Sequence, residues 1–367
     1  MKKHAARRSQ SGFTLVEMMI SIVIALFATL VIAQTFALAE GYRRSGTSGG
    51  DASFSGAVGT YLISRDLSAA GYGFNTAAYY GCDVSLSDKS PPSGTAPRLA
   101  DFTLAPVRID FGTGTAPDAI WAVSSGTSSA PGPINLTAAM SSPTDNYTVS
   151  SAFGVRAGDV LVLAQSGGTS CTLVEASNTP TSATSNQNVI QHASTGGSSR
   201  FNPTGGLGGA YPASAVVIDL GTTPIVNRYY IVNNTLMVDQ EVSGLLAQPV
   251  AANIVQLKAI YGVDNIGDGA VHVWSTTPPA NAAAWASILA VRVALVAQGT
   301  NPDKPSNLTT GQCTTTQAAP AVTWEDGSTT TLDVSTNGSA SGIDWTCFRY
   351  KVFHVTTSLR NVIWTPS

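Results

Sequence analysis

The stretch SGFTLVEMMISIVIAL, residues 11–26, opens the apolar run that decides how this chain is organised. From Phe13 to Ala39, twenty-seven residues are almost wholly apolar, and Glu17 is the only ionisable side chain among them. A helix of that length reaches about 40 Å at ~1.5 Å per residue, enough to span a hydrocarbon core of ~30 Å. Because an ionised side chain in hydrocarbon is costly, Glu17 is predicted to have a function.

Basic residues lie on the N-terminal side of this run, and no acidic residue precedes Glu17. Cytoplasmic flanks of membrane spans carry an excess of Lys and Arg, so the N-terminus is expected in the cytoplasm and the bulk of the chain outside. The apolar region of a cleaved secretory signal has only about 7–15 residues. Residues 13–39 are therefore predicted to remain on the protein as a transmembrane helix that anchors it.

The composition fits an exported protein with a β-rich body. The chain has 367 residues, only 11% of them charged, and a formal net charge of -3. Four of its 19 basic side chains lie in the first twelve positions, so the remainder carries a net charge of -7. A mildly acidic body without a basic stripe disfavours nucleic-acid binding.

The four cysteines are predicted to form two disulfides. They are Cys82, Cys171, Cys313 and Cys347, and none belongs to a C-x-x-C motif or lies at zinc-ligand spacing from a histidine. An even cysteine count in an exported protein indicates disulfides. Three pairings are possible, and we favour Cys313 with Cys347 and Cys82 with Cys171; four buried free thiols are the alternative.

Five glycines between Gly41 and Gly56, both included, follow the apolar run. Each glycine costs a helix about 1 kcal/mol relative to alanine, so residues 40–70 are predicted to be a weak or interrupted continuation of the helix. Helical spacing resumes after this patch, and Gly71 is the expected stop. The apolar residues with this helical spacing are Val58, Leu62, Ile63, Leu67 and Ala70.

Residues 71–367 read as a β-rich head with long polar loops, which makes the expected fold class α+β. Asn233-Asn234 lies between apolar flanks and is typical of a hairpin turn. The run LAVRVALVA, residues 289–297, is apolar on both faces except for Arg292, so this strand is predicted to be buried with Arg292 paired.

No catalytic constellation stands out. GTSGG, residues 46–50, matches the G-x-S-x-G pattern around Ser48, but it follows a membrane helix and lacks the strand-to-helix context of a hydrolase. Asp264 and Asp268 weakly resemble a calcium loop whose twelfth position holds Ser275 in place of Glu, and a tight hairpin connection is favoured. The tryptophans are expected in packing, with a binding surface as the alternative. We expect no enzyme and no cofactor.

The segment Gly12-Phe13-Thr14-Leu15-Val16-Glu17 strongly resembles the class III leader of type IV pilins and type II secretion pseudopilins. The resemblance implies that a membrane prepilin peptidase removes residues 1–12, cutting between Gly12 and Phe13, and that Phe13 is then methylated. It also implies that Glu17 pairs with the charged N-terminus of a neighbouring subunit, which would offset its desolvation.

Segments of the body resemble the PilW group of minor pilins, especially from about residue 250 to residue 367. They are RDLSAAGYGF, AGDVLVLAQSGGTSCTLVEAS, NIVQLKAIYGVD, AVRVALVAQG and RYKVFHVTTSLRN. The resemblance implies a low-abundance subunit that primes the type IV pilus at its tip, together with other minor pilins, the major pilin and a tip adhesin. Its head would lie in the periplasm before assembly and at the cell surface afterwards.

Three other interpretations stay open at this point. The chain resembles a type II secretion pseudopilin of the GspJ kind in its leader and helix. An adhesin delivered to the surface by a pilin-like leader would also fit the long loops and tryptophans. An anchored hydrolase using Ser48 is the least favoured.

Overall fold

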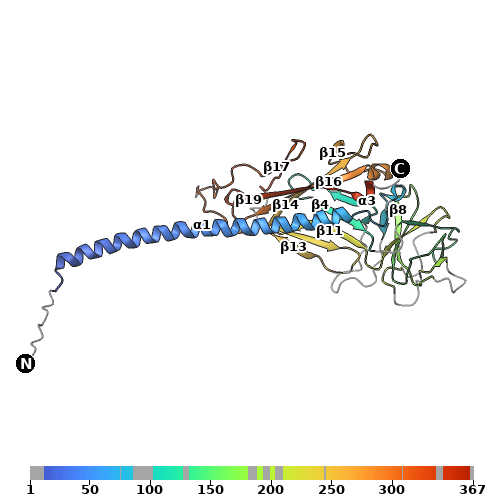
Figure 1. Ribbon diagram of the computed structural model, residues 1–367, viewed down its shortest axis with the longest axis horizontal. Coiled ribbons are helices and arrows are strands. Elements are labelled where there is room, and N and C mark those ends of the chain that lie inside the picture. The colour runs from blue at the N-terminus through green and yellow to red at the C-terminus, as the bar shows by residue number, and fades with distance from the viewer. Residues whose placement is uncertain are drawn as a thin grey trace, which may run out of the picture. The chain divides into compact units, whose positions relative to one another are not determined.

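The computed structural model describes residues 12–74, 76–85, 102–126, 132–180, 188–192, 199–202, 210–243, 245–307, 309–335 and 342–363. The chain divides into two units, residues 1–50 and residues 51–367. Residues 1–11 of the predicted leader, and Trp364, lie outside the described residues. Within the described part, one long helix precedes a head made of β-sheets, which confirms the α+β class (Figure 1).

The helices are α1 (Leu15–Ala69), α2 (Ala282–Ala286) and α3 (Arg360–Ile363), with 3₁₀ turns at Ala77–Tyr79 and Trp345–Cys347. The first strands are β1 (Asp83–Ser85), β2 (Phe102–Thr103), β3 (Val107–Asp110), β4 (Ala119–Ser124), β5 (Pro133–Asn135), β6 (Tyr147–Thr148), β7 (Val160–Ala164), β8 (Ser170–Glu175) and β9 (Val189–Ile190). The later strands are β10 (Val216–Gly221), β11 (Ile225–Val232), β12 (Thr235–Gln240), β13 (Gln248–Ala252), β14 (Ile254–Val263), β15 (Val273–Ser275), β16 (Ile288–Gln298), β17 (Ala321–Thr323), β18 (Thr329–Thr331) and β19 (Tyr350–Ser358).

Three sheets build the described part of the head. Their strand orders are β2-β1-β8-β7-β10-β5, β13-β12-β11-β4-β3 and β15-β14-β16-β19. Two-stranded ladders, β17-β18 and β6-β9, lie outside them. The predicted hairpin turn is confirmed, because Asn233 and Asn234 join β11 to β12 with φ values of 49° and 58°. Asparagine tolerates this left-handed conformation, which a two-residue hairpin requires.

The C-terminal part of α1 is buried in the head along one face. Ala52, Ile63, Leu67 and Ala70 are at most 1% exposed, and Gly56 and Gly59 are buried between them. These spacings of three and four residues place all six positions on one side of a helix. In Figure 1 this part of α1 runs beside β11, β13 and β19.

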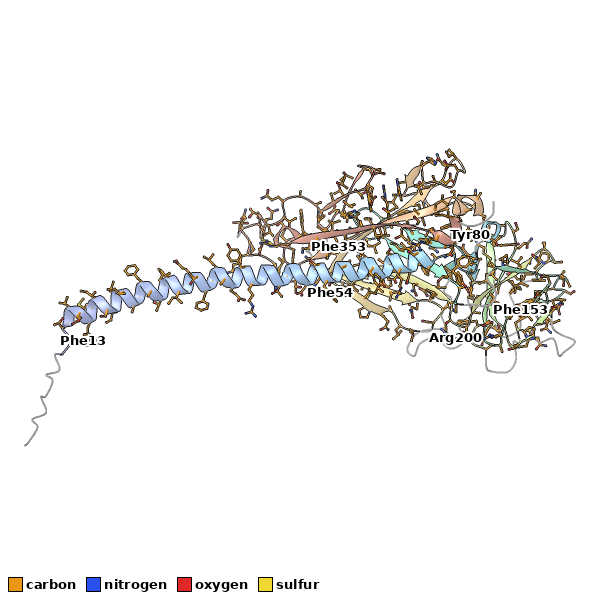
Figure 2. The ribbon with its side chains drawn as sticks, in the orientation of Figure 1. Phe13, Phe54, Tyr80, Phe153, Arg200 and Phe353 are labelled. Atoms are coloured by element: carbon orange, nitrogen blue, oxygen red, sulfur yellow. A yellow bond between two sulfur atoms is a disulfide. The ribbon has the colours of Figure 1, made fainter. Side chains whose placement is uncertain are left out.

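Gly56 and Gly59 let the backbone of α1 approach the sheets closely. A Cβ atom at Gly56 would lie 2.1 Å from the ring of Phe353 on β19, and Figure 2 shows Phe353 beside this stretch of the helix. A Cβ atom at Gly59 would lie 3.0 Å from Leu236 on β12 and 3.1 Å from Leu295 on β16. Both glycines are therefore packing positions.

The expected interruption of the helix was wrong, because α1 runs from Leu15 to Ala69 without a break. Propagating a helix adds one hydrogen bond per residue, whereas starting a second helix would require a new nucleus and new caps. Strong helical segments on both sides therefore carry the helix through Gly41, Gly46, Gly49 and Gly50. The helix ends close to the predicted stop, where Gly71 has a φ of 82°.

The buried strand predicted at residues 289–297 is confirmed as part of β16. All eleven of its residues are buried, and it pairs with β14 on one side and β19 on the other. The core side of this sheet meets α1, and its opposite side packs under the β17–β18 hairpin through Val296, Val322 and Trp324. The most hydrophobic strand thus lies at the centre of a sheet that is covered on both faces.

Gly56→Ala is predicted to lower the free energy of unfolding by about 1–2 kcal/mol, because the added methyl group meets Phe353 and overpacking exceeds the gain in helix propensity. Gly50→Ala is the matched control, since no atom lies within 4 Å of its Cβ position, and it should stabilise by about 0.5–1 kcal/mol. Denaturant unfolding of the full-length protein in detergent micelles measures both changes. Equal stabilisation by the two variants would contradict the close packing at Gly56.

Candidate functional site

The residues of the predicted cleavage and assembly site lie just before α1 and in its first turn. Thr14 precedes the helix, and its hydroxyl oxygen accepts a hydrogen bond from the Glu17 backbone N–H at 3.3 Å. This is one half of a capping box, in which Ser or Thr at the N-cap is followed three residues later by Glu. An acid in the first turn also interacts favourably with the positive end of the helix dipole. Glu17 is thus fixed on the helix at a short distance from Phe13, the predicted mature terminus.

The following turns present a predominantly apolar surface. Large side chains from Phe13 to Leu38 are between 50% and 78% exposed, and Figure 2 shows Phe13 at the start of the helix. An 18-residue stretch of this helix has a mean hydropathy of 2.6, and none of this stretch is buried within the protein. By length and composition α1 can cross a membrane. An exposed apolar surface of this size requires lipid or other apolar helices around it.

A buried acid attaches the other end of α1 to the head. Asp66 is 6% exposed, and its Oδ2 accepts hydrogen bonds from Asn227 Nδ2 at 2.7 Å and from the Tyr229 hydroxyl at 2.6 Å. Arg65 donates to Oδ1 at 2.8 Å from the surface. Asn227 and Tyr229 both lie on β11, so the carboxylate joins the last turns of the helix to one strand of the central sheet.

Asp66 was not singled out by the sequence, although a signal exists. It lies beside Leu67 on the face that also carries Ile63 and Ala70, where the helical spacing leads one to expect an apolar residue. A carboxylate at such a position must be hydrogen-bonded once it is buried. The identity of its partners, more than 160 residues away in sequence, depends on the tertiary structure.

Asp66→Ala is predicted to lower the free energy of unfolding by about 2–4 kcal/mol, since it leaves two buried donors without an acceptor. Tyr229→Phe removes one of these hydrogen bonds and should cost about 1–2 kcal/mol. Arg65→Ala, at a side chain that is 57% exposed, is the control and should cost less than about 1 kcal/mol. Urea unfolding of the full-length protein tests the series, and equal losses for Asp66→Ala and Arg65→Ala would contradict it.

Arg292 is paired, as the sequence predicts. Its side chain is 4% exposed and its guanidinium donates to Asp326 Oδ2 at 2.8 Å and to Glu325 Oε2 at 3.3 Å. The guanidinium carbon also lies 3.7 Å from the ring centroid of Trp274 and 5.1 Å from that of Trp324. Two acids and two aromatic rings therefore compensate the buried charge and hold the β17–β18 hairpin on the sheet.

The loop that weakly resembled a calcium site is organised by its own carboxylates. Asp264 Oδ1 accepts hydrogen bonds from the backbone N–H groups of residues 266–268, and its Oδ2 accepts one from Gly269. Asp268 accepts from His272 at 2.9 Å. These hydrogen bonds lower the pKa of both aspartates. Because N–H groups already surround Asp264, the geometry favours the tight connection between β14 and β15 over a cation site.

Both disulfides follow the favoured pairing. Cys82 is bonded to Cys171, which fastens the start of β1 to β8, and Cys313 is bonded to Cys347, which closes a polar loop before β19. All four sulfurs lie in the head, as expected for an exported domain. Ser48 lies inside α1 and not on a strand-to-helix turn, so the described structure gives it no hydrolase context.

Asp219 on β10 is a fully buried acid that the sequence did not mark. Its Oδ1 accepts the Gly221 N–H at 2.7 Å, whereas no hydrogen-bond partner of its Oδ2 lies within the described residues. Burial raises the pKa of Asp219 from 3.8 to about 6; the Gly221 hydrogen bond opposes this shift and nearby Asp159 adds to it. The folded protein therefore keeps a proton between pH 3.8 and 6 that the unfolded chain has lost.

The stability contributed by this proton falls as the pH rises through that window. Asp219→Asn is therefore predicted to unfold at nearly the wild-type midpoint near pH 4 and to be more stable at pH 7.5, by at most about 3 kcal/mol. Thermal unfolding at a series of pH values measures the difference. The same substitution at exposed Asp51 is the control and should show no such pH-dependent gain. A gain at Asp219 that is independent of pH would contradict the raised pKa.

Two family models match the chain. The prokaryotic N-terminal methylation motif matches residues 7–33, and type IV pilus-assembly protein W, or PilW, matches residues 227–361. Residues 227–361 are similar to PilW. No curated protein and no solved structure matches it significantly.

The two matches cover different parts of the chain, the N-terminal helix and the C-terminal part of the head. The first covers the Gly12–Phe13 junction, Glu17 and most of the apolar run. The second begins on β11 with Asn227, contains Tyr229, and ends within α3. Both residues that hold Asp66 are thus in the PilW match, whereas the Cys82–Cys171 disulfide precedes it. The chain is a type IV pilin-like assembly protein with a prepilin leader and an apolar N-terminal helix.

Proposed function

We propose that this protein is a minor pilin that primes assembly of the type IV pilus and is located at its tip. The observation that carries the proposal is the combination of a prepilin leader, an exposed apolar helix and a PilW-matching head in one chain. The leader directs the protein to the membrane, and the apolar helix packs among the helices of other subunits. The head supplies the surface by which a subunit is recognised.

Processing would begin on the cytoplasmic side of the inner membrane. Prepilin peptidase cuts between Gly12 and Phe13, and methylation of Phe13 follows. The helix then holds the protein in the inner membrane with its head in the periplasm, until assembly moves it into the pilus at the cell surface. The basic residues of the leader and the length of the apolar run support this orientation.

Mature protein extracted from membranes is predicted to start at N-methylated Phe13. Mass spectrometry of the N-terminal peptide measures this directly, because loss of residues 1–12 and addition of one methyl group each change the mass by a known amount. Recovery of an intact N-terminus at Met1 would refute the processing step.

Glu17 would hold the subunit in register with its neighbour. A carboxylate one turn inside the helix can pair with the methylated amino group of an adjacent subunit, and this opposite charge offsets the cost of desolvation. Its hydrogen bond to Thr14 uses only the backbone N–H, so capping leaves the carboxylate available for that pairing.

Glu17→Ala and Glu17→Gln are both predicted to be cleaved normally and to enter pili poorly, with at least tenfold less protein in sheared pili. Gln keeps the size and the helix propensity of Glu but not its charge, so it separates electrostatic pairing from packing. Immunoblots of the membrane and pilus fractions measure both steps. Wild-type incorporation of Glu17→Gln would remove the role proposed for the charge.

Deleting the gene separates the proposal from an adhesin delivered by a pilin-like leader. A priming subunit is required for piliation, so the deletion strain should carry few or no pili. Normal pili that adhere poorly would support the adhesin instead. A type II secretion pseudopilin of the GspJ kind would affect protein secretion and leave piliation intact; the PilW match favours the pilus.

A further inference from the structure

The strand β19 forms the longest free sheet edge in the described part of the head. It has nine residues, Tyr350–Ser358, and pairs with β16 on one side, while no described strand pairs with it on the other side. The other edge strands of the three sheets have two to five residues. An unpaired edge offers a row of backbone N–H and C=O groups that can bind another extended chain.

Two of the other edges, β5 and β13, carry features that block strand addition, the remaining three have only two to four residues, and β19 is neither short nor blocked. Proline starts β5 at Pro133 and occupies β13 at Pro249, and β13 also has a register shift where it pairs with β12. The nine residue pairs between β16 and β19 run without a bulge, and β19 contains no proline. Natural proteins protect exposed edges with short strands, prolines and bulges, so an edge without them is an expected docking surface.

The head holds β19 rigid from both faces and leaves its edge accessible. On the helix side, Thr357 Oγ1 lies 3.2 Å from Ser64 Oγ and Phe353 packs on Gly56. On the other side, the ring of His354 packs edge-on against Trp324, and Thr356 donates to Glu325 at 3.2 Å. Lys351, His354, Thr356 and Ser358 nonetheless remain exposed. A strand that is already ordered loses little conformational entropy when it binds a partner.

The charge around this edge indicates what kind of segment it accepts. Residues 348–363 contain Arg349, Lys351 and Arg360 and no acidic residue, although the whole chain has a net charge of -3. Arg349 is paired with Asp303, and Glu325, which contacts Thr356, is paired with Arg292. Lys351 donates to the neutral hydroxyl of Ser53 at 2.5 Å. An extended segment carrying Asp or Glu therefore fits β19. A second copy of β19 would bring two basic strands together, which is unfavourable.

We propose that β19 binds an extended, acidic strand of a neighbouring pilus subunit's head, which adds to the sheet beyond β19. This inference rests on the proposed function, since it gives the priming subunit its head-to-head contact. The main-chain hydrogen bonds supply affinity, and the pattern of charges selects the partner.

Hydrogen exchange of the full-length protein in detergent micelles tests the edge, alone and after co-expression and copurification with the other minor pilins. Amides of β19 bonded to β16 should be protected in both samples. The alternate amides, which face the free edge, should exchange at least tenfold more slowly in the complex, while exchange in β13 stays unchanged. A stable complex without slower exchange in β19 would overturn the edge contact and leave the proposed function standing. Failure to form any complex would overturn both.

A charge variant provides a second, independent test. Lys351→Glu should weaken the complex about five- to tenfold by repelling an acidic strand, whereas Lys304→Glu, the same change at an exposed loop residue, should have little effect. Thermal unfolding of both variants checks that the head stays folded. Equal affinities for the two variants would refute the acidic partner. Protection of β19 that rises with protein concentration in the absence of partners would instead identify self-association and overturn the proposal.

Discussion

The packing of α1 against the head, without side chains at Gly56 and Gly59, is the constraint on which the rest of the head depends. The two glycines bring the helix backbone against Phe353, Leu236 and Leu295, which belong to strands of two different sheets. A residue with a Cβ atom at Gly56 would push the helix away from β19. Apolar burial along this face is worth roughly 25 cal/mol per Å², and it requires this close approach.

Polar groups inside the head specify how the sheets and the helix fit together. Asp66 binds β11, Arg292 binds the β17–β18 hairpin, and Lys258 on β14 pairs with Asp118 beside β4 at 2.9 Å. Each of these contacts joins elements that are distant in sequence, and each is made through directional hydrogen bonds. Apolar contacts alone would tolerate sliding between these elements, whereas a buried charge has only one arrangement in which it is satisfied.

The same chain therefore meets two different physical requirements. Residues 13–39 keep their apolar side chains exposed for lipid or other helices, whereas from Ala52 onward one face of the helix is buried by the head of its own chain. The last described strand of the head, β19, has one edge with which no described strand pairs. Assembly by a pilin-like protein requires surfaces left without an internal partner, and the apolar helix and the β19 edge are such surfaces within the described residues.

The sequence by itself determined the elements whose physics is local: the membrane-length helix with Glu17, the leader, the Asn233-Asn234 turn and the buried β16 with a paired Arg292. Hydropathy, charge and turn preference are properties of neighbouring residues, so they can be read along the chain. The prediction for the glycines after Ala39 was wrong, because helix propensity predicts an interruption there and helix cooperativity overrides it. Gly56 also has a packing role, since its missing side chain lets α1 approach Phe353. The partners of Asp66, the burial of Asp219 and the free edge of β19 were decided only by the tertiary structure, since each depends on strands brought together from distant parts of the chain.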